Sequence, residues 1–360
     1  MNEKEARMSR LFETVPQNVD AVLVSSELNQ RYFTDFPLAD GLVLLLRNTQ
    51  PVLFTDFRYA EAAEKAGLAP FIMDLTAQKQ RPARVAELLK KADAHTLAYE
   101  DETMTCAEFA VWQDTLAGFA LVGAGNVMEN LRTFKSETEI GYITQAQRIA
   151  ERALTELLPH ITPDRTELEL AAELEYRMRL HGAEGFAFDT IAISGTASSL
   201  PHGVPRDVKL ERGFLTIDFG AKYHGYCSDM TRTFCIGKPT AEEKKIYETV
   251  LAAQTAVLDV IASGSDCGKM DGIARKIIDD AGYAGCFGHS LGHGVGMFVH
   301  EEPRLSAARF GAALLPGMVV TVEPGVYLAG KCGVRIEDMV AVTEEKTYDL
   351  TEFPKELMIL

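Results

Sequence analysis

The sequence predicts a protein of two parts, a smaller α/β domain over residues 1–133 and a larger α+β domain over residues 134–360. The chain of 360 residues is long enough for roughly two domains of about 100–200 residues each. Short apolar runs alternate with helical stretches before residue 130, whereas helices and strands come in blocks after it. A helix start with its own capping residues marks the boundary.

Regular elements alternate along the N-terminal part. The apolar runs predict strands at 21–25, 41–46 and 52–55, and the amphipathic stretches predict helices at 58–66 and 84–91. This alternation is typical of an α/β domain.

The C-terminal part begins with two capped helices. Ser136 with Glu139 forms one capping box, and Thr166 with Glu169 forms another, whose helix ends near Gly182. Later segments rich in β-branched and aromatic residues predict strands at 190–194, 214–220, 226–236, 318–326 and 334–342, with helices at 241–261 and 270–281.

The charge balance excludes several kinds of partner. The chain carries 52 acidic and 36 basic residues, a formal charge of −16, without a basic patch, so we expect no nucleic-acid and no membrane partner. The charged N-terminus lacks the apolar core of a secretory signal, and no apolar run reaches the roughly 20 residues of a membrane helix. Six cysteines without a C-x-x-C pair favour reduced thiols and a cytoplasmic location.

One motif suggests a serine hydrolase. Residues 288–292 read Gly-His-Ser-Leu-Gly, which matches a nucleophile elbow. That fold requires an acid and then a histidine after the serine, but no acid separates Ser290 from the last histidine, His300. The motif is therefore not interpreted as a catalytic triad.

Acidic residues stand inside apolar strands. Asp218 lies in the run 214–220, where an unpaired buried carboxylate needs a cation or strong hydrogen-bonding partners. Asp229 follows in the next predicted strand, beyond a turn between Gly220 and Gly225. The two acids are expected to meet across a hairpin.

The same pattern recurs at Glu323 and Glu337, which lie in two predicted strands with a glycine-bearing turn at 329–333 between them. His293 lies between two glycines, which leave room for its imidazole to approach a crowded centre. Each acid alone could form a salt bridge or a strand-end hydrogen bond. Together, the four carboxylates and one imidazole favour two divalent ions, such as Mn²⁺, Co²⁺, Zn²⁺ or Fe²⁺.

These residues stand in specific contexts: Ile-Asp-Phe-Gly at Asp218, Ser-Asp-Met-Thr-Arg-Thr at Asp229, Gly-His-Gly-Val-Gly at His293, Val-Glu-Pro-Gly at Glu323 and Arg-Ile-Glu-Asp at Glu337. In this order the set resembles the metallopeptidases of the pita-bread fold (family M24), and within them prolidase and aminopeptidase P. The resemblance implies a pita-bread catalytic domain over 134–360, preceded by a creatinase-like N-terminal domain over 1–133.

The resemblance also implies roles. Asp229 and Glu337 would bridge two metal ions, with Mn²⁺ or Co²⁺ favoured. Asp218 would complete one ion, and His293 with Glu323 would complete the other. A metal-bridging hydroxide would attack the scissile carbonyl. Glu323 would shuttle the proton, and His202 and His300 would contact the substrate carbonyl and the tetrahedral intermediate.

Four further residues are candidates with two interpretations each. Arg304 would hold a substrate carboxylate or pair with a neighbouring acid, and for Arg335 a structural ion pair is favoured. Thr231 and His289 would orient metal ligands, although a β-favouring strand residue explains Thr231 equally well and a buried hydrogen-bonded histidine is the favoured explanation of His289.

The resemblance predicts hydrolysis of the Xaa-Pro bond in dipeptides or at peptide N-termini, by a homodimer. Methionine removal on the same fold and a catalytically silent peptide-binding protein are the alternatives. The first is less favoured because many such enzymes lack an N-terminal domain of this length, and the second because no ligand is lost.

Overall fold

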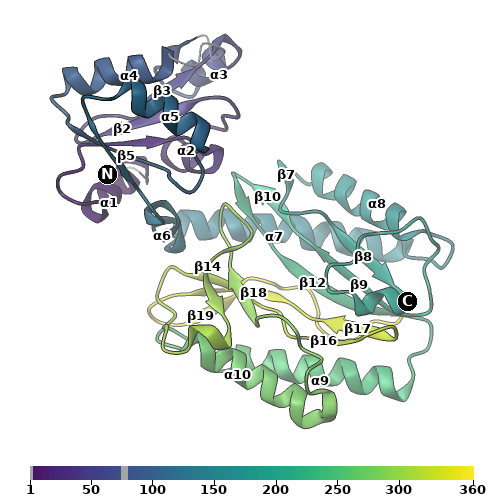
Figure 1. Cartoon of the computed structure of the whole chain (residues 1–360). Helices are drawn as coiled ribbons and strands as arrows, with labels where there is room; N and C mark the ends of the chain where they lie inside the picture. The colour runs from purple at the N-terminus through teal and green to yellow at the C-terminus, as the bar shows by residue number, and fades with distance from the viewer. Residues whose placement is uncertain (1–2, 74–79) are drawn as a thin grey trace. The chain divides into compact units, whose positions relative to one another are not determined.

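The computed structural model describes residues 3–73 and 80–360 (Figure 1). The chain forms two compact units, Met1–Leu131 and Arg132–Leu360. Among the described residues, no helix is both long enough and apolar enough to cross a membrane.

The N-terminal unit contains one six-stranded sheet with strand order β4-β3-β2-β1-β5-β6. Its strands are β1 (Ala21–Val24), β2 (Leu42–Leu46), β3 (Val52–Thr55), β4 (Phe71–Ile72), β5 (Thr96–Tyr99) and β6 (Ala120–Gly123). Its helices are α1 (Glu3–Thr14), α2 (Glu27–Thr34), α3 (Phe57–Lys65), α4 (Gln80–Lys91) and α5 (Cys106–Thr115), and α6 (Val127–Thr133) continues into the second unit.

This sheet is mixed. β1 pairs antiparallel with β2 and parallel with β5, and all residues of β1 and β2 are buried. The predicted strands at 21–25, 41–46 and 52–55 correspond to β1, β2 and β3, and the predicted helices to α3 and α4. The sequence did not predict α5, because its apolar residues do not form one stripe, or β6, whose residues are largely exposed.

The C-terminal unit has four long helices, α7 (Glu137–Leu157), α8 (Glu167–Leu180), α9 (Ala241–Leu258) and α10 (Cys267–Ile278). Short helical turns lie at η1 (Leu158–His160), η2 (Gly195–Ser199), η3 (Asp279–Tyr283) and η4 (Ala307–Arg309). Its strands are β7 (Gly185–Phe186), β8 (Ile191–Ser194), β9 (Gly213–Phe219), β10 (Ala221–Tyr223), β11 (Tyr226–Cys227), β12 (Met230–Ile236), β13 (Gly292–Gly294), β14 (Glu301–Leu305), β15 (Val319–Val322), β16 (Gly325–Leu328), β17 (Cys332–Arg335), β18 (Asp338–Val342) and β19 (Thr347–Asp349).

Two helix pairs enclose the strands of this unit (Figure 1). One core joins α7 and α8 to the sheet β12-β9-β8, through residues such as Leu154, Leu170 and Ile217. A second core joins α9 and α10 to the sheet β14-β13-β15-β18-β19, through residues such as Val250 and Val320. Sheets flanked by separate helix pairs confirm the predicted α+β class.

Both predicted capping boxes of this unit are present. The Ser136 hydroxyl accepts the Glu139 N–H, and the Glu139 carboxylate accepts the Ser136 N–H, at the start of α7. Thr166 and Glu169 make the same exchange at the start of α8. Each box satisfies two N–H groups that a helix start leaves without partners.

Three predicted strands are wrong in one respect, because each is interrupted. The segment 226–236 divides into β11 and β12, 318–326 into β15 and β16, and 334–342 into β17 and β18. Asp229, Glu323 and Glu337 lie at these breaks, so only Asp218 stands within a strand. In a continuous strand the side chains on one face lie in a row along the strand. A break in the strand allows the carboxylate at that position to turn toward the carboxylates of the other strands.

Two glycines allow the close backbone approaches around these breaks. A Cβ atom on Gly220 would lie 1.9 Å from the Ser228 carbonyl oxygen, and one on Gly292 would lie 2.0 Å from the Thr321 carbonyl oxygen. Any side chain at either position would force the backbone apart. These contacts bring Asp218 near Asp229 and His293 near Glu323.

Candidate metal centre

Five side chains from separate segments line one cavity of about 460 Å³ in the C-terminal unit. They are those of Asp218, Asp229, His293, Glu323 and Glu337. Ligand atoms of Asp229, His293 and Glu337 lie within 4.8 Å of one another. The structure therefore brings all five predicted ligands together.

The imidazole of His293 lies among the carboxylates. Its Nε2 lies 3.2 Å from Glu323 Oε1 and 3.6 Å from Asp229 Oδ2. Its Nδ1 lies 3.1 Å from the Gly294 carbonyl oxygen. Because a carbonyl only accepts, Nδ1 carries a proton, and Nε2 is the ring nitrogen that faces the carboxylates of the cavity.

The acids shift the pKa values of one another. Burial and the charges of Glu337 and Asp218 raise the pKa of Asp229 well above its ordinary value. Burial, with the charges of Glu323 and Asp218, does the same to the pKa of Glu337. Burial also raises the pKa of Asp218, against the opposing charge of Arg335. These three carboxyls favour protons unless a cation compensates them.

Glu323 differs from the other acids. Burial alone would raise its pKa, but hydrogen bonding to His293 and the charges of His293 and His289 outweigh burial and lower the pKa to about 2. Its carboxylate also accepts a hydrogen bond from the Thr321 hydroxyl at 3.1 Å. Glu323 is therefore ionised at neutral pH.

This donor set fits divalent cations. Carboxylate oxygens and a neutral imidazole nitrogen are the ligands of hard or borderline divalent ions, and four acids exceed what one ion requires. Asp218 Oδ1 is buried and has no hydrogen-bond partner among the described residues. Because Asp218 lines this cavity, its buried and unpaired carboxylate oxygen is an available ligand atom.

The expected ion pair of Arg335 is present, and its partner is Asp218. Arg335 Nη2 lies 2.5 Å from Asp218 Oδ2, and Nε donates to the Thr231 hydroxyl at 3.0 Å. The Thr231 hydroxyl in turn donates to Glu337 Oε2 at 2.6 Å. Arg335 and Thr231, which are hydrogen-bonded to each other, thus orient two of the candidate ligands, Asp218 and Glu337.

His289 contacts the centre less directly. Its Nδ1 lies 2.9 Å from the Ser290 carbonyl oxygen and 3.9 Å from Glu323 Oε2. Its Nε2 lies 2.9 Å from the Tyr327 hydroxyl, which also accepts from Arg335 Nη1 at 2.8 Å. Burial lowers the pKa of His289, against the opposing effect of the Glu323 charge.

Three further predicted residues line the same cavity: His202, His300 and Arg304. The His300 ring centroid lies 4.4 Å from that of His293. Burial and the neighbouring charges of His293 and Arg304 lower the pKa of His300 to about 4, so it is neutral at physiological pH. Within the described part of the chain, Arg304 has no carboxylate partner within salt-bridge distance.

A buried ion-pair cluster fixes the segment that carries His300. The carboxylate of Glu301 is 3.0 Å from both Arg132 Nε and Lys135 Nζ, and it accepts the Phe298 N–H at 3.2 Å. Both cations are buried. The sequence did not predict this cluster, because Glu301 is simply an acid beside His300, and Arg132 and Lys135 are two basic residues far away in the chain, before α7.

Sequence reasoning also missed Arg232, which is only 1% exposed. Its guanidinium donates to the backbone carbonyls of Thr231 and Glu337 at 2.9 and 2.7 Å and to Asp338 Oδ1 at 2.8 Å. It also donates to the carbonyls of Phe353 and Pro354 at 2.6 and 2.9 Å. Arg232 therefore joins the Glu337 backbone to the C-terminal segment.

The alternation of side chains between the two faces of a strand could have identified Arg232 as a buried structural residue. Thr231 and Thr233 occupy one face of β12, so Arg232 must point to the other face, and every residue of that strand is buried. Nothing comparable identifies Tyr327, because a tyrosine in a strand is common and its hydroxyl partners come from distant segments.

Comparison with known families gives matches over both parts of the chain. Residues 141–344 match metallopeptidase family M24, and residues 13–134 match the creatinase/prolidase N-terminal domain.

Individual relatives match along nearly the full length. An uncharacterized peptidase of Bacillus subtilis, YqhT, is 40% identical over 343 residues, 95% of this chain and 96% of that protein. The structure of an Xaa-Pro dipeptidase from Bacillus anthracis superposes with a TM-score of 0.92 at 37% identity, covering 99% of this chain and 100% of the other. That of an X-Pro aminopeptidase from Thermotoga maritima gives 0.91 at 36% identity, covering 98% and 100%.

Metal binding should release protons. The raised pKa values of Asp229 and Glu337 mean that the metal-free centre retains protons that ordinary carboxyls would have lost. A cation binds the ionised form, so its affinity should rise with pH and fall as pH drops through the raised pKa values. Titration of EDTA-stripped protein with Mn²⁺ in weakly buffered indicator solution measures the protons released. The Asp229→Asn variant should release fewer, and proton-free, pH-independent uptake would contradict the assignment.

Arg232→Lys should weaken metal binding about 10–100-fold, the usual effect of losing a group that positions a ligand. Lysine cannot reproduce the five-donor fork that holds the Glu337 carbonyl. Competition with a chelator, at a temperature where the variant is folded, measures the affinity. Arg148→Lys is the matched control, because Arg148 donates to the Leu350 carbonyl of the same C-terminal segment without touching a candidate ligand. Equal losses in both variants would show a general stability effect instead.

Proposed function

The chain belongs to metallopeptidase family M24, and from this premise we propose that it hydrolyses the peptide bond before proline, in Xaa-Pro dipeptides or at peptide N-termini. The single observation that carries the proposal is the convergence of Asp229, His293 and Glu337, with Asp218 and Glu323 beside them, in one buried cavity. The similarity to an Xaa-Pro dipeptidase and an X-Pro aminopeptidase supports the substrate class.

The five acidic and imidazole groups would hold two divalent ions, with Mn²⁺ or Co²⁺ as the proposed metals and Zn²⁺ or Fe²⁺ as alternatives. We assign Asp229 and Glu337 to both ions, Asp218 to one, and His293 with Glu323 to the other. The bound ions would acidify a water molecule and polarise the scissile carbonyl.

The remaining steps fall to side chains of the cavity. Glu323 is ionised and lies at the cavity wall, so it can take a proton from the attacking water and pass it to the leaving proline nitrogen. His300 is neutral, and we propose that it and His202 donate hydrogen bonds to the substrate carbonyl and to the oxyanion that develops from it.

Three side chains would keep these groups in place. Arg335 holds Asp218, Thr231 holds Glu337, and His289 lies against Tyr327 and Glu323. Arg304 remains available for a substrate, and we propose that it binds the free carboxylate of a short peptide in bidentate fashion. Such a contact favours dipeptides over longer peptides.

Three further features belong to the proposal. We propose the functional division at 133/134, close to the boundary of the two compact units. A homodimer is proposed from the family alone. A cytoplasmic location is proposed because all six cysteines are free thiols in the structure.

The activity is tested with EDTA-stripped protein, incubated with Ala-Pro, Ala-Pro-Ala and Met-Ala-Ser, with and without added Mn²⁺ or Co²⁺. We expect metal-restored cleavage before proline, measured as release of free alanine. Ala-Ala is the control for proline selectivity. Cleavage of Met-Ala-Ser alone would indicate methionine removal, and no metal-restored cleavage of any peptide would indicate a silent homologue.

Asp229→Ala and Glu337→Ala should each abolish turnover and lower the bound metal, because each residue would serve two ions. Metal content by elemental analysis and turnover of Ala-Pro are the measurements. Asp189→Asn provides a control, since Asp189 is an exposed acid that lines the same cavity without being a proposed ligand. Retention of two ions by either alanine variant would refute the shared-ligand assignment.

A further inference from the structure

A second cavity lies wholly within the N-terminal unit, at the carboxyl ends of two parallel strands. The chain runs from β1 to β2, β3 and β4 on one side of the sheet, and then to β5 and β6 on the other. The direction of strand addition therefore reverses between β1 and β5, which are parallel neighbours. The crevice at such a reversal is where open α/β sheets bind ligands.

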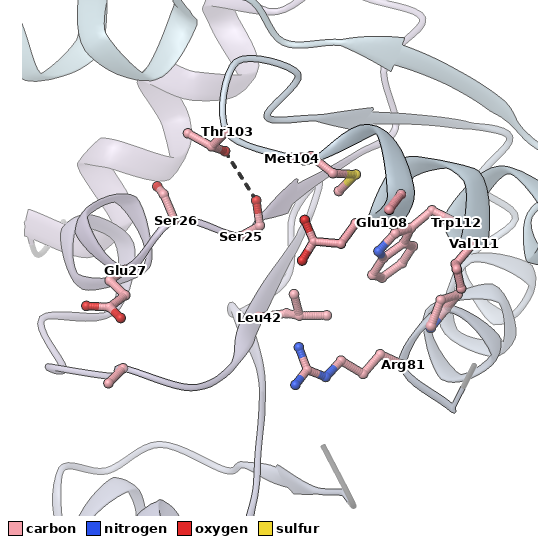
Figure 2. Close-up of a pocket in the computed structure, with 13 residues that line it drawn as sticks. Ser25, Ser26, Glu27, Leu42, Arg81, Thr103, Met104, Glu108, Val111 and Trp112 are labelled. Carbon is pink, nitrogen blue, oxygen red and sulfur yellow. Dashed lines mark hydrogen bonds between the residues drawn. The ribbon is translucent and has the colours of Figure 1, made fainter. Parts of the chain in front are cut away.

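This pocket has a volume of about 550 Å³, within the usual range for small-molecule sites. Figure 2 shows Ser25 and Thr103, from the loops that follow β1 and β5, on one side of it. Their hydroxyl oxygens lie 3.5 Å apart. Leu42, Met104 and Trp112 provide apolar surface, and Trp112 is only 8% exposed.

The start of α2 borders the pocket, but the N–H groups there already have a hydrogen-bond acceptor within the protein. The buried carboxylate of Glu100 accepts hydrogen bonds from the backbone N–H groups and the hydroxyls of Ser25 and Ser26. It also accepts from the Asn29 side chain at 2.5 Å. The helix start thus already faces a negative charge, so the charges on the other walls determine which ligand the pocket prefers.

Those walls carry charges of both signs. Arg81 at the start of α4 and Glu108 on α5 direct their charged groups into the same space, as Figure 2 shows, and Glu27 lies on the opposite wall. Hydrogen bonds from Thr105 lower the pKa of Glu108, and the charge of Arg81 adds to this effect, so Glu108 is ionised. Two carboxylates against one guanidinium disfavour phosphates and other polyanions.

We propose that this pocket binds a small zwitterion with an apolar body, namely an apolar amino acid or a short apolar peptide. Arg81 would bind its carboxylate, Glu108 its ammonium group, and Leu42, Met104 and Trp112 its side chain. The hydroxyls of Ser25 and Ser26 donate to Glu100, so their oxygens offer lone pairs to an ammonium proton. This assignment does not depend on the proposed peptidase activity.

The pocket contains its own reporter, because Trp112 is the single tryptophan of the chain. Titration of EDTA-stripped, full-length protein with L-leucine or L-methionine should give a saturable change in tryptophan fluorescence. N-acetyl-leucine lacks the ammonium group and leucinamide lacks the carboxylate, so each should bind about tenfold more weakly or worse. Saturation-transfer NMR on the leucine methyl groups provides a second readout. The absence of any response in both measurements, or binding of either derivative as tightly as leucine, would overturn the proposal.

Two variants localise the binding. Arg81→Gln should weaken leucine binding about tenfold or more, and Glu108→Gln should do so while keeping the capping box, which glutamine also forms. Arg84→Gln is the matched control, because Arg84 also lies on α4 but does not line the pocket. Unchanged binding in Arg81→Gln, or an equal loss in Arg84→Gln, would contradict the assignment.

Discussion

The catalytic unit is organised around one electrostatic constraint, the convergence of four carboxylates on one cavity, three of them buried and the fourth, Glu323, partly buried. Two unit charges about 5 Å apart repel by roughly 3 kcal/mol at an effective dielectric constant of about 20. Several such pairs would consume much of the roughly 5–15 kcal/mol by which a domain is stable. Arg335 forms an ion pair with Asp218 and so offsets the charge of that carboxylate directly. Asp229 and Glu337 retain protons or require cations.

The backbone features around the cavity follow from this constraint. Carboxylates that must converge cannot all stand in regular strands, so three strand segments are interrupted. Asp229 separates β11 from β12, Glu323 separates β15 from β16, and Glu337 separates β17 from β18. Each break removes ladder hydrogen bonds, and other contacts replace them. Arg232 supplies several at once, because its guanidinium binds carbonyls from β12, from the Glu337 break and from the C-terminal segment.

The sequence predicted the elements with strong local signals. The capping boxes at Ser136 and Thr166, and the glycines around His293, depend on neighbouring residues and could be recognised directly. The break at Glu337 could not, because an apolar β-rich segment reads the same whether it is continuous or bent. The break at Glu323 does have a local signal, the Pro324-Gly325 pair, which the predicted strand over 318–326 overlooked. Partners such as Arg232 with Phe353 were hidden for another reason, since a contact across more than a hundred residues leaves no local pattern.

The arginines show most clearly what only the structure can distinguish. Arg232, Arg304 and Arg335 all stand in strand segments, and in each case the sequence permits either an ion pair or a ligand contact. In the structure, Arg335 pairs with Asp218 and Arg232 with Asp338, and both are buried. Arg304 shares the cavity without an acidic partner among the described residues, so its guanidinium alone is available to an incoming carboxylate. In the proposed assignment, Arg304 would therefore be the side chain that binds the free carboxylate of a dipeptide, through the planar fork of its guanidinium.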